Sequence, residues 1–113
     1  MATIQKLNNS NLISMNVQIN QEIIEYFKDK PAVRKVYIFG SYARNEETPE
    51  SDVDILVDLD YMKEPSFSGF EFGGMWEDLK DLLKMKVDLV PEDGMSKYLR
   101  PFIEKDRILI LEK

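Results

Sequence analysis

The spacing of apolar residues near the start of the chain predicts an amphipathic helix over residues 17–30. Apolar side chains recur there at intervals of four, one and three residues, which places them on one helix face. They are Ile19, Ile23, Ile24 and Phe27. Asn16 is a candidate N-cap. Pro31 ends the helix because proline disfavours helical geometry in the residue before it.

Four shorter runs, rich in β-branched and aromatic residues, predict strands. They span residues 33–39, 52–58, 86–90 and 107–111. Helical spacing returns at 74–85 and again around 95–103, where Pro101 should bend or split the helix. This order predicts a single α/β (α+β) domain, with a mixed sheet of about four strands flanked by helices and the last strand at an edge.

Two segments show neither helical spacing nor a strand pattern. Residues 1–15 are polar and rich in Asn and Ser, so we expect a polar N-terminal arm before a domain at 16–113. Residues 61–73 contain Pro65, Gly69 and Gly73 beside three phenylalanines, which predicts a loop. This loop either lies as a flap on the core or presents an aromatic surface to a partner or a nucleotide base.

Composition narrows the function. With 113 residues and 43% apolar content, the chain fits one compact domain. It has no apolar run of about 18 residues, so no membrane span is expected, and its N-terminus lacks the order of a signal peptide. Cysteine and histidine are both absent, which excludes thiol catalysis, Ser-His schemes and His/Cys zinc sites within this chain. We expect a cytoplasmic protein.

The charge argues against long nucleic acids as partners. The formal net charge is −6, with 15 basic and 21 acidic residues, and no basic stripe is visible. Proteins that grip a phosphate backbone normally show such a stripe, because counterion release drives that binding. Among the acids, Asp58 and Asp60 are expected to be solvated at the end of their strand.

Three carboxylates are candidates for chemistry. Alternate strand residues point to one side, so Asp52 and Asp54 project together while Val53 and Ile55 enter the core. Neighbouring carboxylates raise each other's pKa unless a cation lies between them, and Mg²⁺ is the usual cation for oxygen ligands beside a phosphate substrate. If the strand of Asp88 pairs with theirs, all three carboxylates meet at one end of the sheet.

A phosphate-binding turn is predicted beside them. Gly40-Ser41 follows a strand and is expected to start a strand-to-helix turn, where backbone N–H groups and the helix dipole favour phosphate. Three carboxylates and a triphosphate can hold two Mg²⁺ ions about 4 Å apart across an in-line displacement. The third carboxylate could also orient or deprotonate the attacking hydroxyl.

These residues resemble the nucleotidyltransferase superfamily that has the DNA polymerase β palm fold. The matching features are Gly40-Ser41, ten intervening residues, Asp52-Val53-Asp54, and Asp88 in a later strand. The segments GSYAR, SDVDILV, KVDLV and YLRPFIEKDRILI are most similar to its minimal nucleotidyltransferases, the MntA-like antitoxins. The resemblance covers residues 17–113.

The resemblance implies a palm-like fold and a Mg²⁺-dependent enzyme that transfers AMP from ATP to a Tyr, Ser or Thr hydroxyl of a partner protein (AMPylation). In this family the partner is a HEPN-domain RNase toxin, so a hetero-oligomer with that toxin is implied. Asp52 and Asp54 would bind metal. Asp88 would bind the catalytic metal and help activate the acceptor, and Gly40 and Ser41 would hold the triphosphate.

Two further positions bear on this comparison. Arg44 matches the family pattern, and it either contacts phosphate or forms an ion pair that braces the turn. Asn45 stands where the family usually has Gly. Asn tolerates left-handed geometry better than most residues, so we expect the turn to survive.

Other functions remain open from the sequence. One is nucleotidyl transfer to a small molecule such as an aminoglycoside, although those relatives normally carry an extra helical domain that this chain lacks. Another is a non-catalytic antitoxin that acts by binding alone. A tRNA or poly(A) polymerase is disfavoured, because both a basic surface and extra domains are missing.

Overall fold

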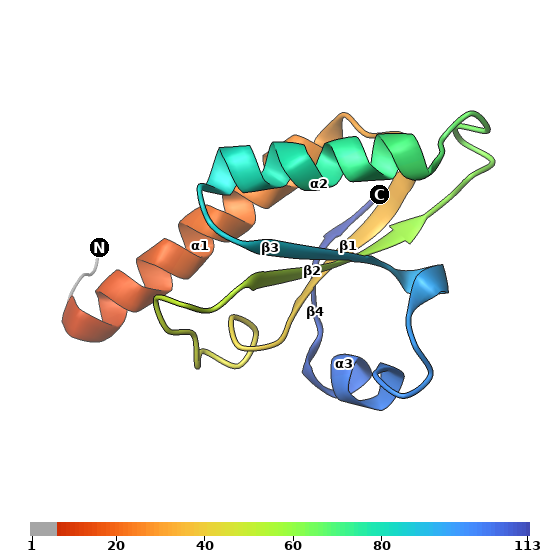
Figure 1. Ribbon diagram of the computed structural model, residues 1–113. Helices are drawn as coiled ribbons and strands as arrows, with labels where there is room; N and C mark the ends of the chain where they lie inside the picture. Colours follow the sequence, from red (N-terminus) through yellow and green to blue (C-terminus); the bar gives the residue numbers. More distant parts are fainter. Residues whose placement is uncertain (1–6) are drawn as a thin grey trace.

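The computed structural model describes the backbone of residues 7–113 and the side chains from residue 16 onward. Its helices are α1 (Leu7–Lys28), α2 (Gly69–Leu83) and α3 (Arg100–Asp106), with a short 3-10 turn η1 (Glu92–Gly94). Its strands are β1 (Val33–Phe39), β2 (Val53–Leu59), β3 (Val87–Pro91) and β4 (Ile108–Glu112). The predicted order of helices and strands is confirmed (Figure 1). No helix in the described range has the length and apolar character needed to cross a membrane.

The four strands form one mixed sheet in the order β3-β2-β1-β4. β1 pairs antiparallel with β2 and with β4, and β4 lies at an edge as predicted. β2 and β3 are parallel, and α2 forms the crossover between them. Parallel neighbours need such a crossover because a tight turn cannot connect them.

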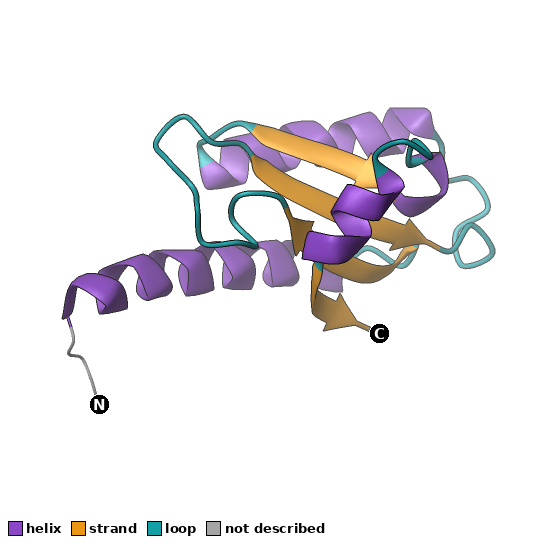
Figure 2. Ribbon diagram, turned by 90° about the horizontal axis from the view of Figure 1, so that it is seen from below, coloured by secondary structure: helices purple, strands orange, loops and turns teal. Residues whose placement is uncertain are grey.

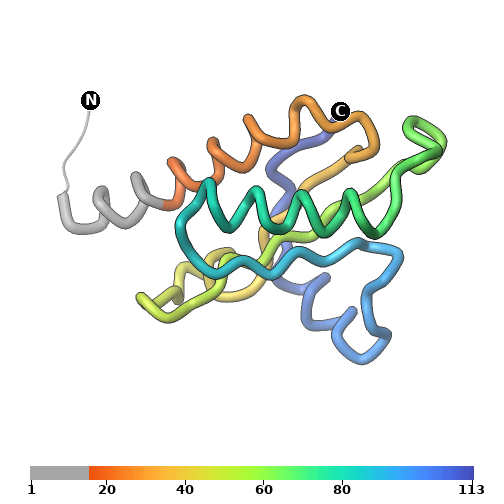
Figure 3. Tube along the Cα trace, turned by 45° about the horizontal axis from the view of Figure 1, so that its top comes forward, coloured from red at the N-terminus to blue at the C-terminus, as the bar shows by residue number. Residues whose placement is uncertain are grey.

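The two faces of the sheet are covered differently. On one face, α1 and α2 run side by side over the main core (Figure 3). Its fully buried side chains include Ile23, Phe27, Val36, Ile55 and Leu79. On the other face, α3 lies over a smaller cluster, seen in front of the sheet in Figure 2. That cluster contains Phe39, Leu56, Met95 and Ile103. Asp54 and Asp88 share the parity of Leu56 and Val90, so they lie on the α3 side.

The first helix begins earlier than the apolar spacing predicts. α1 starts at Leu7, so Asn16 lies inside it, and the N-cap prediction is wrong. The Asn16 side chain instead donates from Nδ2 to Asn45 Oδ1 at 3.1 Å. Polar residues carry no apolar period, so the pattern could not show that the helix extends through them. Residues 1–6 of the expected arm lie outside the described residues.

α2 also begins earlier than predicted, at Gly69, so the expected loop is wrong for residues 69–73. The reason is a capping box: the Ser68 side chain accepts from Phe70 N at 3.2 Å, and the Glu71 side chain accepts from Ser68 N at 2.8 Å. These contacts satisfy N–H groups that the first turn of a helix leaves unpaired. The glycines are therefore tolerated within the helix.

Pro101 neither bends nor splits the last helix, so that prediction is wrong. α3 begins at Arg100, which places Pro101 in its first turn. Proline is well suited to that position because its missing N–H would have no partner there anyway.

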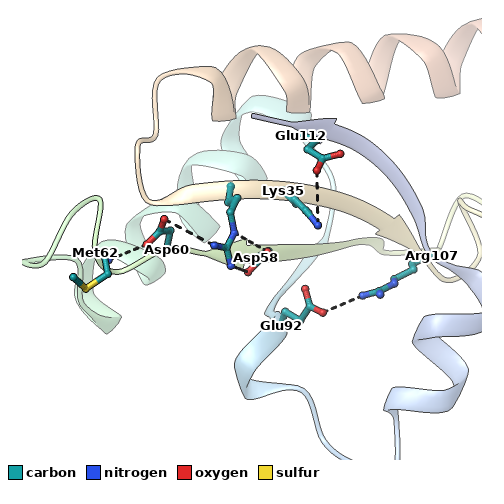
Figure 4. A network of polar contacts seen from close by, with 8 residues as sticks. Lys35, Asp58, Asp60, Met62, Glu92, Arg107 and Glu112 are labelled. Carbon is teal, nitrogen blue, oxygen red and sulfur yellow. Dashed lines mark hydrogen bonds and ion pairs between the residues drawn. The ribbon is translucent and has the colours of Figure 1, made fainter.

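Ion pairs also join the strands to each other and to their connecting segments. Glu92 pairs with Arg107 at 3.3 Å and Lys35 with Glu112 at 3.8 Å (Figure 4). Asp58 accepts two hydrogen bonds of 3.0 Å from Arg34 and its side chain is only 19% exposed, so the expectation that it is solvated is wrong.

Candidate active site

The structure brings the predicted carboxylates to one end of the sheet. Asp54 on β2 and Asp88 on β3 are direct partners in the parallel register, and Asp52 immediately precedes β2. The condition set in the sequence analysis, that these two strands pair, is therefore met. In Figure 1 this is the end of the sheet where α2 leads into β3.

The carboxylates interact electrostatically. Burial raises the pKa of Asp54 to about 6, with further increases from the negative charges of Asp88 and Asp52, while Arg44 opposes the shift. Burial and the charge of Asp52 also raise the pKa of Asp88. The negative charge of this group is therefore only partly compensated by the protein itself.

Gly40 brings the end of β1 directly against Asp54. Phe39 pairs with Asp54 in the antiparallel register, and the next residue, Gly40, has φ +75°. A β-carbon at Gly40 would stand 2.1 Å from Asp54 Oδ2. Only glycine combines this backbone conformation with such a close approach.

The segment after Gly40 forms a single helical turn rather than a helix. Arg44 N donates to Gly40 O at 3.1 Å, and Glu46 N donates to Ser41 O at 2.8 Å. Asn45 closes the turn with φ 58°, so the prediction that Asn supports a left-handed turn is confirmed. The predicted helix at this position is wrong, so a helix dipole does not contribute to phosphate binding here.

The turn still offers donors for an anion. In the described part of the chain, the N–H groups of residues 41–43 have no backbone acceptor. This is the arrangement found at the start of a helix, where the first N–H groups are unpaired. A phosphate oxygen near Ser41 would satisfy them.

Arg44 joins this turn to α3. Its Nε donates to Glu46 Oε1 at 2.9 Å, and one terminal nitrogen donates to Asp106 Oδ2 at 2.5 Å. Asp106 ends α3, and its side chain is 18% exposed. The structure therefore shows Arg44 in the role of an ion pair bracing the turn, and contact with a nucleotide stays a prediction. No sequence signal pointed to Asp106, which lies 62 residues away.

The residues present fit a hard divalent cation. All three candidate ligands supply carboxylate oxygens, which Mg²⁺ prefers. Burial, with a further contribution from neighbouring negative charge, raises the pKa of Asp54 and of Asp88, and a cation between the carboxylates would offset that charge. No group of three or more ligating side chains within the described range has metal-binding spacing. A complete coordination shell would therefore need further oxygens, such as those of a triphosphate.

Comparisons with known proteins agree with this geometry. The model of the nucleotidyltransferase domain family matches residues 21–110. A Methanocaldococcus jannaschii protein named for protein adenylyltransferase activity is 43% identical over 84 residues, which cover 74% of this chain and 82% of that protein. The protein adenylyltransferase MntA of Thermococcus cleftensis is 32% identical over 83 residues, covering 74% and 80%.

Solved structures share the fold. A toxin–antitoxin complex with AMP-PNP aligns with a TM-score of 0.70 at 23% identity, over 83% of this chain and 73% of that one. The complex of a tri-AMPylated Shewanella oneidensis HEPN toxin with an MNT antitoxin aligns with a TM-score of 0.67 at 22% identity, over 88% and 74%. A minimal nucleotidyltransferase aligns with a TM-score of 0.62 at 23% identity, over 93% and 98%.

Proposed function

The chain belongs to the nucleotidyltransferase domain family, and from this premise we propose that it transfers AMP from ATP to a Tyr, Ser or Thr hydroxyl of a partner protein. One observation carries the proposal. The sheet register sets Asp54 between Gly40 on one side and Asp88 on the other. A nucleotide held by the turn would therefore have its reacting phosphate beside two carboxylates.

In this proposal the turn binds the triphosphate and the carboxylates bind the metal. The unpaired N–H groups near Ser41 and its hydroxyl bind the triphosphate, and Gly40 permits the close approach. Asp52, Asp54 and Asp88 hold Mg²⁺, with two ions as the family resemblance implies. The metal supplies charge neutralisation at the phosphate oxygens when it is bound.

The proposed step is an in-line displacement at the α-phosphorus. The acceptor oxygen forms a bond to that phosphorus, and the bond to the oxygen bridging toward the β-phosphate breaks. Pyrophosphate leaves with the electron pair. The hydroxyl proton passes to the Asp88 carboxylate, which is the direct partner of Asp54 in the parallel register.

The proposed partner is a HEPN-domain toxin, with which this chain would act as an antitoxin in a hetero-oligomer. Support comes from the relative named MntA and from neighbours solved as toxin–antitoxin complexes.

The test uses ATP labelled at the α-phosphate, Mg²⁺, the purified protein and a candidate HEPN partner. We expect label on the partner with the wild-type chain and with Asp81→Asn, an exposed control on α2, but none with Asp54→Asn. Label that persists in Asp54→Asn would contradict the carboxylate site. If MgATP binds but no protein is labelled, a small-molecule acceptor replaces the protein acceptor. Absence of MgATP binding would instead favour neutralisation by contact alone.

A further inference from the structure

Three large apolar side chains are exposed together on the outer side of α3 and the turn before it. Tyr98, Leu99 and Phe102 are 77%, 56% and 68% exposed, whereas Ile103 on the inner side is 5% exposed. Leu99 is the N-cap and has helical backbone angles, so Phe102, three residues later, adjoins it on the helix surface. No other element of the described chain covers this side of α3 (Figure 1). We call these three exposed residues the α3 patch. Adjoining exposed apolar side chains of this kind mark interaction sites.

The α3 patch lies on the same face of the sheet as the carboxylates. α3 covers the face that carries Asp54 and Asp88 (Figure 2). Its last residue, Asp106, pairs with Arg44 in the turn beside Asp54. Phe102 is four residues before Asp106, which is about 6 Å along the helix axis. A protein bound to the patch would therefore reach the carboxylates without crossing the sheet.

The other exposed aromatic surface lies at the opposite end of the sheet. Tyr61 and Met62 follow the end of β2, and Phe70 is in the first turn of α2. The carboxylates are at the start of β2, which has seven residues, and a strand of that length spans about 20 Å. A partner held only at that end would contact this chain far from the reacting groups. The α3 patch is therefore the better placed surface for a protein whose hydroxyl must reach the site.

The rim of the α3 patch is positively charged. Residues 95–107 contain four basic and two acidic residues, in a chain whose net charge is −6. Both acidic side chains are already in ion pairs with arginines. Lys97 and Lys105 are exposed, and neither pairs with a carboxylate among the side chains described. Lys97 Nζ stands 5.5 Å from the centre of the Tyr98 ring, and Lys105 is three residues after Phe102. This surface is complementary to an apolar segment that has carboxylates beside it.

A second copy of this chain matches the patch poorly. A symmetric dimer built on the patch would place the same residues of the two copies against each other. Lys97 and Lys105 would then lie close to the same lysines of the other copy. Like charges brought together at an interface cost binding free energy. A different protein with acidic side chains avoids this repulsion.

We propose that the α3 patch docks the partner protein that receives AMP, through a segment of that partner whose apolar side chains are flanked by Asp or Glu. The inference rests on the proposed function, because it names the surface that holds the partner of that reaction. Phe102 is the anchor of this contact, and Lys97 and Lys105 pair with the carboxylates of the partner. Aromatic side chains that become desolvated at an interface carry a large share of its binding free energy.

The test is calorimetric titration of the HEPN partner into this chain without ATP. Phe102→Ala should bind at least about tenfold more weakly than wild type. Phe70→Ala is the matched control, because Phe70 is also exposed on a helix, at 89%, and this variant should bind as wild type does. Lys105→Glu should weaken binding by about fivefold or more at low salt. Lys63→Glu, an equal charge change in the exposed segment after β2, should not.

Several outcomes would overturn the docking surface. They are an unchanged affinity in Phe102→Ala, an equal loss in Phe70→Ala, and no binding by the wild-type chain. A dimer of this chain that Phe102→Ala dissociates in sedimentation, with the affinity for the partner unchanged, would show that the patch binds a second copy instead.

The transfer assay separates this proposal from the proposed function. Phe102→Ala should raise KM for the partner and leave KM for ATP unchanged. Label that depends on Asp54, with a KM for the partner that does not respond to Phe102→Ala, would leave the proposed function intact and overturn the docking surface. Binding that depends on Phe102 without any label would support the docking surface and contradict the transfer.

Discussion

Asp54 Oδ2 lies where a β-carbon on Gly40 would have to be, with only 2.1 Å between the two positions. The strand register causes this contact, because Phe39 is the direct partner of Asp54 and Gly40 follows at φ +75°. The turn that begins at Gly40 and the partly buried Asp54 carboxylate are therefore built as one unit.

Gly40→Ala should disrupt both fold and function. The left-handed backbone costs about 1–2 kcal/mol for a residue with a side chain, and the clash with Asp54 adds to this. We expect a lower free energy of unfolding in urea and loss of label transfer. Gly73→Ala is the matched control: it has no atom within 4 Å of its added carbon and lies in α2. That variant should gain about 0.5–1 kcal/mol. A Gly40→Ala protein as stable as wild type would contradict the geometry.

The sequence predicted those parts of the fold that depend on local residue patterns. Residues 33–39 were expected as a strand and form β1 with the same bounds, because β-branched and aromatic residues are typical of an interior strand. The pairing that joins Asp54 to Asp88 could be stated as a condition, since both strands carry one carboxylate between apolar neighbours. These two results located the candidate site.

Other features could not be read in the same way. The Arg44–Asp106 ion pair joins residues 62 positions apart, and such a contact exists only once the chain has folded. The start of α1 was not visible in the sequence pattern because this part of the chain is rich in Asn and Ser. The Ser68–Glu71 capping box was present in the sequence, but the glycines at 69 and 73 argued against a helix there, and capping together with packing prevailed over propensity.

Asp54→Asn should stabilise the metal-free protein at neutral pH. The pKa of Asp54 is raised from 3.8 to about 6, so the folded state holds its proton more tightly than the unfolded state does. The contribution of Asp54 to the free energy of unfolding is fully present below about pH 4. It is lost as the pH rises through about 6. The half-exposed position limits the effect to about 1 kcal/mol.

The measurement is urea unfolding in EDTA at pH 4 and at pH 7.5. Asp54→Asn should exceed wild type at the higher pH and match it more closely at the lower one. Asp81→Asn, which is exposed on α2, should show no such pH-dependent gain. A constant difference between Asp54→Asn and wild type at both pH values would rule out charge repulsion as its cause.

The Arg44–Asp106 pair should couple more strongly than Arg44–Glu46. Asp106 is 18% exposed and Glu46 65% exposed, so the first pair is less screened by water. A double-mutant cycle with Arg44→Gln and Asp106→Asn should give a coupling free energy of about 0.5–1 kcal/mol. The cycle with Glu46→Gln should give less. Equal coupling in both cycles would show that Asp106 does not brace the turn.

Removal of Mg²⁺ should abolish the stabilisation that a nucleotide gives to the protein. The three carboxylates repel a triphosphate unless a cation lies between them, so a non-hydrolysable ATP analogue should raise the thermal midpoint only with Mg²⁺ present. At a ligand concentration about 100 times Kd, the gain would be about 2.7 kcal/mol.

Asp54→Asn serves as the control for this measurement. It should show little shift with MgATP analogue, even though its own ligand-free midpoint is the higher one. A higher ligand-free midpoint together with a smaller shift indicates the loss of a metal ligand. General destabilisation would instead lower both the ligand-free midpoint and the midpoint with the analogue. If the analogue stabilises wild type equally in EDTA, the nucleotide binds without the carboxylates and their proposed role as metal ligands is wrong.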